Sequence, residues 1–221
     1  MVSDPLSEIR PSVLDALTAF NTKFEKKTPY MYTDVRGLVT TGIGNLIDTG
    51  GGMGGYGLAL NLPWTHRGGA PASKAEIIAA WQKVKAAWPD VQGGSAQSLT
   101  DLRIDEATIN SLVLDRVRQN HNALRAKYPG YVNWPADAQL GLHSIAWAAG
   151  PYVPLHTFAG AVNKQDPDFV AAAKASKLND QGNPGLVPRN QATKQLFLNA
   201  AQVKDQGMNY DTLLYQKDLP S

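Results

Sequence analysis

The stretch that decides the fold of this 221-residue chain is FEKKTPYMYTDVRGLVTTGIGN, from Phe24 to Asn45. An apolar helical stripe runs into it, and Thr28-Pro29 marks a break in the chain. Residues 30–35 are rich in β-forming side chains, Arg36-Gly37 supplies a turn, and residues 38–43 form a second extended run. The stretch therefore predicts a helix followed by a β-hairpin.

Three oxygen-bearing side chains occur along this helix and hairpin. Glu25 lies at the expected helix end, Asp34 just before the turn, and Thr40 on the returning strand. Cleavage of a glycosidic bond needs a carboxylic acid to protonate the leaving oxygen, and inverting enzymes hold a second carboxyl about 6.5–9.5 Å away to activate a water. A threonine hydroxyl can orient that water. Taken singly, each carboxylate is more simply explained as a solvated helix end or a turn former.

The spacing of these residues resembles the motif of the phage-type lysozymes, the T-even phage muramidase family (glycoside hydrolase family 24). That motif is Glu, eight residues, Asp, five residues, Thr, one residue and Gly-x-Gly, which Glu25, Asp34, Thr40 and Gly42-Ile43-Gly44 match without a gap. The resemblance implies that Glu25 is the general acid, that Asp34 holds and activates the water, and that Thr40 fixes its position. It implies inverting hydrolysis of the β-1,4 bond between N-acetylmuramic acid and N-acetylglucosamine, without a metal or cofactor.

The resemblance also implies a lysozyme-like fold of the α+β class, mainly helical, with a small β-hairpin lobe and a larger helical lobe around one buried helix. We expect a single domain over residues 1–221. Its expected parts are a hairpin lobe (28–48), a Gly-rich insertion bordering the cleft (49–72), a helical lobe (1–27 and 73–204) and a C-terminal tail (205–221).

Apolar residues at helical spacing predict the individual helices. Pro11 opens the first helix, and Ser73 with Glu76 forms a capping box before the second. Residues 138–149 are apolar on most of the helix circumference, as expected of the buried helix. The remaining helices are expected over residues 105–128, 155–163, 167–177 and 190–203. The irregular tail carries four side chains that can dock on the body, namely Tyr210, Leu213, Leu214 and Tyr215.

Further residues are candidates for substrate contact. Tyr32 and Gly44 lie inside the motif. Tyr56 and Trp64 supply rings in the insertion that can stack on sugars, although Trp64 suits the core equally well. The pair Arg189-Asn190 echoes a segment that the family carries before its last long helix.

Two other patterns suggest different chemistry but lack its context. The residues from Gly52 to Gly57 formally match G-x-G-x-x-G, yet no helix opens there and no βαβ unit surrounds them, so nucleotide binding is not indicated. His143 precedes Ser144 on the apolar helix without a G-x-S-x-G elbow, which favours a buried, hydrogen-bonded pair.

The chain departs from the family pattern at three places. Asn45 stands where many relatives have His, which implies a changed ion pair. Ala148 stands where many relatives have an amide side chain two residues before the glycine matched by Gly150, which implies a changed sugar contact. The insertion at residues 46–69 is longer than in compact relatives and implies a different cleft shape.

Composition limits the other function classes. The chain has 43% apolar residues, no cysteine and a net charge of +2, with a sequence pI near 8.7. It therefore has no disulfide or thiolate site, and it lacks the dense basic patches of nucleic-acid binders. No apolar run is long enough to span a membrane, and the N-terminus lacks the apolar core of a signal peptide. We expect a monomer made in the cytoplasm that reaches the cell wall after holin-type release or delivery by a secretion system or phage tail.

The partner implied by the resemblance is bacterial peptidoglycan, and the implied role is that of a bacteriolytic, antimicrobial wall hydrolase. An endolysin, a tail lysin and a secreted antibacterial toxin with a cognate inhibitor protein all fit the sequence. Two alternative activities also remain. One is a non-catalytic lysozyme-like module that binds glycan or a partner, and the other is a lytic transglycosylase, which needs Glu25 but not the water held by Asp34.

Overall fold

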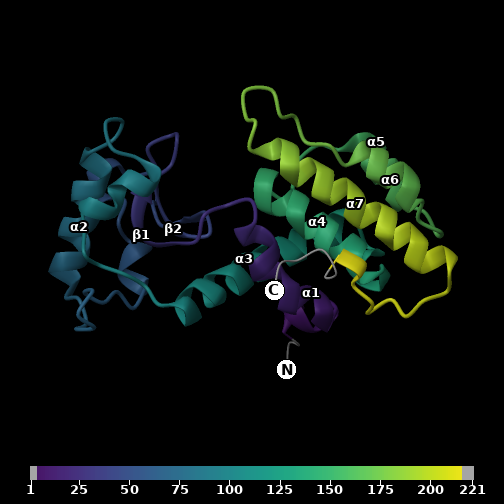
Figure 1. Ribbon diagram of the computed structural model, residues 1–221, viewed down its shortest axis with the longest axis horizontal. Helices are drawn as coiled ribbons and strands as arrows, with labels where there is room; N and C mark the ends of the chain where they lie inside the picture. Colours follow the sequence, from purple (N-terminus) through teal and green to yellow (C-terminus); the bar gives the residue numbers. More distant parts are fainter. Residues whose placement is uncertain (1–3, 216–221) are drawn as a thin grey trace. The chain divides into compact units, whose positions relative to one another are not determined.

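The computed structural model describes residues 4–215 and has an α+β fold that is mainly helical, with one small antiparallel sheet (Figure 1). Its residues divide into two compact units. Unit 1 contains the described residues of 4–24 and 114–215, and unit 2 contains residues 25–113. Among the described residues, no helix is long and apolar enough to cross a membrane.

Unit 2 is built on the sheet. Strand β1 (Thr28–Thr33) pairs with β2 (Val39–Gly42), which pairs with β3 (Asn45–Leu46). The predicted hairpin is confirmed, but β1 begins two residues earlier than expected, and β3 was not expected at all. Beyond the sheet come η2 (Gly52–Gly54), η3 (Ala59–Asn61), α2 (Lys74–Ala86), η4 (Gly93–Ser98) and the first part of α3 (Glu106–Lys127).

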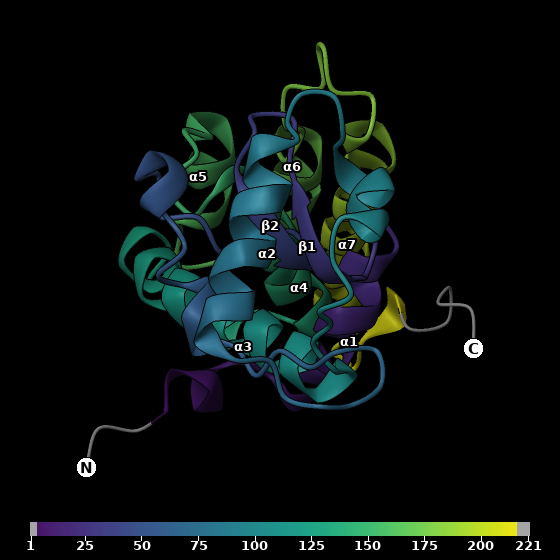
Figure 2. The ribbon, with the colours of Figure 1, turned by 90° about the vertical axis from the view of Figure 1, so that its left-hand side faces the viewer.

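Helix α2 belongs with the sheet, which corrects the expected boundary of the helical lobe at residue 73. Its capping box forms as predicted, with Ser73 and Glu76 bonded reciprocally. Helix α2 packs beside β1 and η3. The buried face of this helix consists of Ile77, Trp81 and Val84. Figure 2 shows α2 lying along β1 and β2. The apolar stripe of a helix indicates that it packs, but not against which partner, so the sequence did not assign α2 to the sheet.

Unit 1 is a helical body centred on α4 (Ala136–Ala149). Every residue from Ala136 to Trp147 is buried, which confirms the predicted central helix. Around it are η1 (Pro5–Glu8), α1 (Pro11–Thr22), the second part of α3, η5 (Tyr131–Asn133), α5 (His156–Val162), α6 (Phe169–Ala175) and α7 (Leu186–Asp205).

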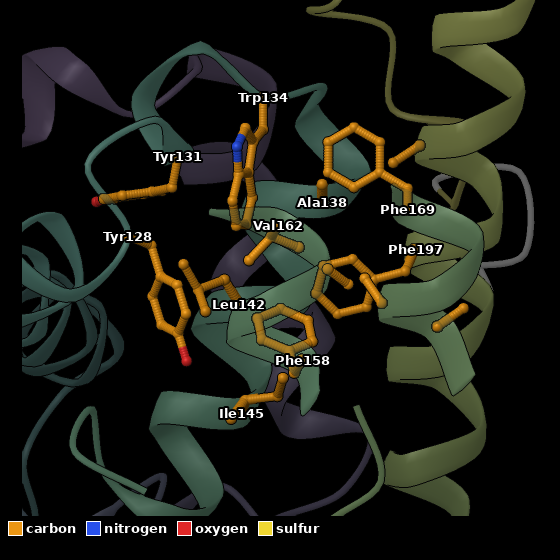
Figure 3. Packing of buried hydrophobic residues seen from close by; sticks show 14 of the residues in the cluster. Tyr128, Tyr131, Trp134, Ala138, Leu142, Ile145, Phe158, Val162, Phe169 and Phe197 are labelled. Atoms are coloured by element: carbon orange, nitrogen blue, oxygen red, sulfur yellow. The ribbon is translucent and has the colours of Figure 1, made fainter. Parts of the chain in front are cut away.

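The core of unit 1 is dominated by aromatic rings that meet edge to face (Figure 3). The ring centroids of Phe158 and Phe197 lie 5.0 Å apart, and those of Tyr128 and Phe158 lie 5.6 Å apart. A glycine in α4 permits the close approach of α7, because a Cβ atom at Gly141 would lie 3.0 Å from the Phe197 ring. Burial of such rings is a main source of stability for a body of this kind.

The C-terminal tail docks on unit 1 as far as residue 215. Leu213 and Tyr215 are buried, and the ring of Tyr215 lies 5.4 Å from that of Phe20. The backbone N–H groups of Leu214 and Tyr215 donate to the carboxylate of Asp137. The docking expected for these tail residues is confirmed, while the expected tail beyond residue 215 lies outside the described residues.

Candidate active site

The strand register gathers the motif residues on one face of the sheet. Tyr32 on β1 lies directly opposite Thr40 on β2. Opposed residues of an antiparallel pair point to the same face, and so do residues two apart along an extended chain. Asp34 lies two residues after Tyr32, and its backbone continues the ladder through the N–H that it donates to the Leu38 carbonyl at 3.0 Å. Tyr32, Asp34 and Thr40 are therefore neighbours on one face of unit 2.

The turn holds one oxygen of the Asp34 carboxylate and leaves the other accessible. Oδ1 accepts hydrogen bonds from the backbone N–H of Arg36 at 2.8 Å and of Leu38 at 2.9 Å. Oδ2 lies 3.7 Å from Nε of Arg36, an exposed side chain that solvent or ligand can displace. The side chain of Asp34 is 27% exposed. Asp34 is thus both the turn former and a carboxylate presented to solvent, so the two interpretations of this residue are compatible.

Thr40 is held beside this turn. Its side chain is buried, and Oγ1 donates to the carbonyl of Leu38 at 3.1 Å. Leu38 therefore connects the two polar groups, because its N–H binds Asp34 while its carbonyl binds Thr40. The lone pairs of the Thr40 oxygen remain as acceptors for a water.

Glu25 does not lie at the end of α1 as expected. The helix ends at Thr22, and Glu25 follows in a bend before β1. The side chains of Asn21 and Thr22 donate hydrogen bonds to the backbone carbonyls of Leu17 and Thr18, one turn earlier. Such side-chain bonds compete with the backbone hydrogen bonds that would extend the helix. Glu25 is half-buried, and it belongs to unit 2 together with Asp34 and Thr40.

Tyr32 connects the two carboxylates electrostatically. Burial and the negative charges of Glu25 and Asp34 raise the pKa of the Tyr32 hydroxyl to about 12, against a hydrogen bond from the backbone of Gly44. Both carboxylates must lie near this hydroxyl for their fields to act on it, since such interactions decay with distance. The tyrosine is therefore a neutral phenol at ordinary pH, and the charges of both carboxylates act on it.

The turn after β2 explains the glycines of the motif. Gly42 and Gly44 have φ angles of 65° and 68°, a left-handed conformation that favours glycine. Asn45 closes this turn, because its Oδ1 accepts the N–H of Ile43 at 3.1 Å and its Nδ2 donates to the Leu112 carbonyl at 3.3 Å. The resemblance implies a histidine ion pair at this position, and in this chain the Asn45 amide instead forms a hydrogen bond to α3.

The two aromatic candidates in the insertion do not both fit the expected sugar contact. Trp64 is only 2% exposed, and its Nε1–H donates to the Ala59 carbonyl at 2.8 Å. Its ring is part of the core, so the expected stacking role is wrong and the alternative core role is correct. Tyr56 is half-buried and packs edge to face on Trp81, with the ring centroids 6.1 Å apart.

Arg189 and Asn190 on α7, like Trp64, are buried and bonded to other residues of the protein. Arg189 is 2% exposed, donates to Oδ1 of Asn21 at 3.0 Å and lies over the Phe24 ring at 4.8 Å. Asn190 uses both atoms of its amide on the backbone of Leu178, each at 2.9 Å. The expected sugar contacts of these two residues are therefore corrected to packing and loop anchoring within unit 1.

The pair His143–Ser144 is buried as expected, but the two side chains do not bond to each other. The Ser144 hydroxyl lies 2.8 Å from that of Thr193, and Nε2 of His143 has no hydrogen-bond partner. Burial lowers the pKa of His143 to about 3, so the ring is neutral. Among the described residues, no group of three His, Asp or Glu side chains is placed to hold a metal ion.

Two residues that position the site were missed from the sequence. Lys85 on α2 donates to the carbonyl of Gly37 in the Asp34 turn at 2.7 Å and to Oδ2 of Asp48 at 2.8 Å. The pattern Asp48-Thr49-Gly50 signals a turn. No local signal indicates that a lysine almost forty positions later lies against the hairpin.

Comparisons with known proteins found no match: no family model, no curated protein and no solved structure is similar to this chain.

Proposed function

We propose that this chain is a muramidase, a glycoside hydrolase that cleaves the β-1,4 bond between N-acetylmuramic acid and N-acetylglucosamine in bacterial peptidoglycan, by an inverting mechanism. The observation that carries the proposal is the strand register, with Tyr32 opposite Thr40 and Asp34 two residues further on. The charges of Glu25 and Asp34 both act on the Tyr32 hydroxyl, which supports including the second carboxylate in this group. The motif spacing supports the same assignment.

In the proposed reaction Glu25 is the general acid. Its carboxyl group gives a proton to the glycosidic oxygen as the bond from that oxygen to the anomeric carbon breaks. Glu25 is half-buried in the bend before β1, in the same unit as Asp34 and Thr40, and its charge acts on the Tyr32 hydroxyl.

Asp34 is the general base. Its Oδ1 is held by two backbone donors, and this fixes the direction of Oδ2, which binds the attacking water. The water oxygen bonds to the anomeric carbon from the face opposite the leaving group, and its proton passes to Oδ2. The Thr40 hydroxyl is the second contact of this water. Atoms balance as one water consumed and one bond cleaved, with the configuration at the anomeric carbon inverted.

The test is mass spectrometry of the muropeptides released from purified peptidoglycan by wild type, Glu25→Gln and Asp34→Asn. A matched control is Asp15→Asn, which neutralises an exposed carboxylate on α1. Wild type and the control are expected to release hydrolysed N-acetylmuramic ends, while each site variant loses about a hundredfold to ten-thousandfold in rate without a change in melting temperature.

The other outcomes assign the alternative activities. Anhydro-muramic ends that persist in Asp34→Asn define a lytic transglycosylase. Tight retention on the wall without any release by wild type defines a binding module. Activity retained in Glu25→Gln overturns the proposed mechanism altogether.

A further inference from the structure

One large aromatic side chain of unit 2 is exposed beside the Asp34 turn. Trp88 follows α2 and is 42% exposed, whereas the other four tryptophans of the chain, Trp64, Trp81, Trp134 and Trp147, are at most 3% exposed. Tryptophan is enriched at binding interfaces, because its large ring buries much apolar area on contact with a ligand. Val35, in the same turn, is 85% exposed, so this turn carries a second exposed apolar side chain.

The ring of Trp88 rests on the turn itself. Gly37 closes this turn, because its N–H donates to the Asp34 carbonyl at 3.0 Å. A Cβ atom at Gly37 would lie 2.7 Å from Cδ2 of Trp88, so the indole covers this glycine directly. The first and last residues of a β-turn have Cα atoms within about 7 Å of each other. The indole is therefore a near neighbour of the Asp34 backbone.

The segment that carries Trp88 is fixed to the hairpin on both sides of Asp34. Before Trp88, Lys85 donates to the Gly37 carbonyl at 2.7 Å. After it, the carbonyl of Val91 accepts from the Thr33 hydroxyl at 3.3 Å. These two anchors lie at Thr33 and Gly37, on either side of Asp34 in the chain. Because successive side chains of a strand point to opposite faces, the Thr33 side chain and the Trp88 segment that it binds lie on the face of the hairpin opposite to the Asp34 side chain. A ring held in this way loses little further freedom when a ligand stacks on it.

We propose that Trp88, together with Val35 of the turn, forms a sugar-binding platform at the tip of the hairpin, which stacks on the apolar face of one pyranose ring of the glycan strand. The proposal rests on the proposed function, and it adds a binding subsite to that reaction. A pyranose presents C–H groups on one face and hydroxyl groups at its edge. The indole and Val35 match the face, and the exposed guanidinium of Arg36, in the same turn, is a donor for the oxygens at the edge.

The exposure pattern of the tryptophans supplies a direct readout. Because Trp88 is the exposed one of five, a neutral quencher such as acrylamide reaches its fluorescence and not that of the buried rings. Peptide-free glycan strands, mixed with the Glu25→Gln protein in a stopped-flow instrument, are expected to remove this quenching within the mixing phase. Trp88→Phe in the same background should show little quenching with or without glycan.

Kinetics on the same strands give the second readout. Trp88→Ala is expected to raise KM roughly tenfold, because it removes one aromatic stacking contact with the bound sugar. It should leave kcat within about twofold, because the ring does not touch the reacting atoms. Trp88→Phe should recover most of the affinity, since a smaller aromatic face remains. Leu58→Ala removes an apolar side chain of similar exposure, 44%, from the same unit and serves as the matched control, with unchanged KM.

The outcomes separate this proposal from the proposed function. Full acrylamide quenching in saturating glycan, together with an unchanged KM in a folded Trp88→Ala protein, overturns the platform even if Glu25 and Asp34 prove catalytic. Protection of Trp88 with full activity in Glu25→Gln overturns the reaction and leaves the platform standing. A melting curve for each variant distinguishes lost binding from lost fold.

Discussion

Nζ of Lys85 lies 2.8 Å from Oδ2 of Asp48, and the same ammonium donates to the carbonyl of Gly37 at 2.7 Å. The side chain of Asp48 is fully buried, and its two oxygens also accept the N–H groups of Val39 and Gly50. One ion pair thus joins α2, the start of β2, the insertion and the hairpin turn. It contacts the turn that carries Asp34 through the Gly37 carbonyl, although neither Lys85 nor Asp48 belongs to the proposed catalytic group.

Replacing Lys85 by methionine is expected to destabilise the protein by about 3–5 kcal/mol, because a buried carboxylate is left without its counter-charge. Urea denaturation at pH 7 measures this loss. Lys83→Met, which changes an exposed lysine on the same helix, is the control and should stay within about 0.5 kcal/mol of wild type. Equal stability of the two variants would contradict the structural role of Lys85.

The same pair predicts a pH dependence. Burial raises the pKa of Asp48, but the hydrogen bond from Lys85 and those from Gly50 and Val39 outweigh this effect and hold the pKa below its usual value of 3.8. Asp48 therefore stabilises the fold above pH 3.8, and this contribution is lost as the pH falls through the lowered pKa. The difference in free energy of unfolding between wild type and Lys85→Met should shrink below pH 3.8, and a difference that grows there would refute the assignment.

How far the sequence predicted these relationships depends on whether they are local. Helix α4, the capping box at Ser73 and the hairpin turn at Gly37 follow from patterns within a few residues, and all are confirmed. The side of the molecule on which a helix packs is not local. Trp64 and Trp81 have the same residue type as Trp88, and only the tertiary structure buries the first two and exposes the third.

The candidate site shows the same division. The spacing of Glu25, Asp34 and Thr40 can be read directly, and the alternation along β1 then places Tyr32 beside them once the register is known. The roles expected of Arg189 and Asn190 failed because burial and partner choice depend on residues far away in sequence, Asn21 and Leu178. Such side chains resemble ligand-binding residues until the structure shows their internal partners.

Tyr32→Phe is expected to lower kcat on glycan strands about tenfold with little change in KM, because it removes a hydroxyl on which the charges of both proposed catalytic carboxylates act. Since the pKa of this hydroxyl is about 12, the phenol stays neutral at lower pH, and the ratio of variant to wild-type kcat should be constant from pH 4 to pH 9. Steady-state kinetics across this range provide the measurement.

The control for Tyr32→Phe is Tyr30, the other tyrosine of β1, which is buried. Tyr30→Phe removes a hydroxyl that donates to the Gly94 carbonyl at 3.2 Å. It should cost about 1 kcal/mol of stability and leave kcat unchanged. If both variants lose activity to the same degree, the effect on kcat belongs to the strand and not to the position of Tyr32.

His66 forms a second pH-sensitive contact in unit 2. Its Nδ1 lies 2.8 Å from Oδ2 of Asp101, and its Nε2 lies 3.3 Å from Oε1 of Glu76. The hydrogen bond with Asp101, then the negative charges of Asp101 and Glu76, raise the pKa of His66 above its usual 6.5 despite some desolvation. Its contribution to stability is therefore complete below pH 6.5 and is lost as the pH rises through the raised pKa.

An NMR titration of the histidine ring protons tests this contact, with His66→Asn assigning the resonance. Asp101→Asn should move the pKa of His66 down towards 6.5 and flatten the fall in melting temperature between pH 6 and pH 9. His156→Asn, which replaces an exposed histidine in unit 1, should leave both observations unchanged. An unshifted His66 in the Asp101→Asn protein would show that the contact does not form in solution.

Asp137 is expected to hold the C-terminal segment on unit 1. Its buried carboxylate accepts Nδ2 of Asn199 at 3.0 Å and the N–H groups of Leu214 at 2.8 Å and Tyr215 at 3.1 Å. Asp137→Ala leaves these donors without an acceptor, and each unsatisfied donor costs about 1–3 kcal/mol. We expect a loss of roughly 3 kcal/mol in urea denaturation. The loss is below the sum for three donors, because the C-terminal segment can detach and let water bind its free N–H groups.

Hydrogen exchange localises the effect of Asp137→Ala. The amides of Leu214 and Tyr215 should lose their protection, while amides in the middle of α4 stay protected to the limit set by global unfolding. Asp137→Asn separates charge from hydrogen bonding: burial raises the pKa of Asp137, so removing the charge relieves a desolvation cost while the amide oxygen remains an acceptor. This variant should therefore lose less stability than Asp137→Ala. A larger loss in Asp137→Asn would mean that the charge itself, acting on the two N–H donors, holds the tail in place.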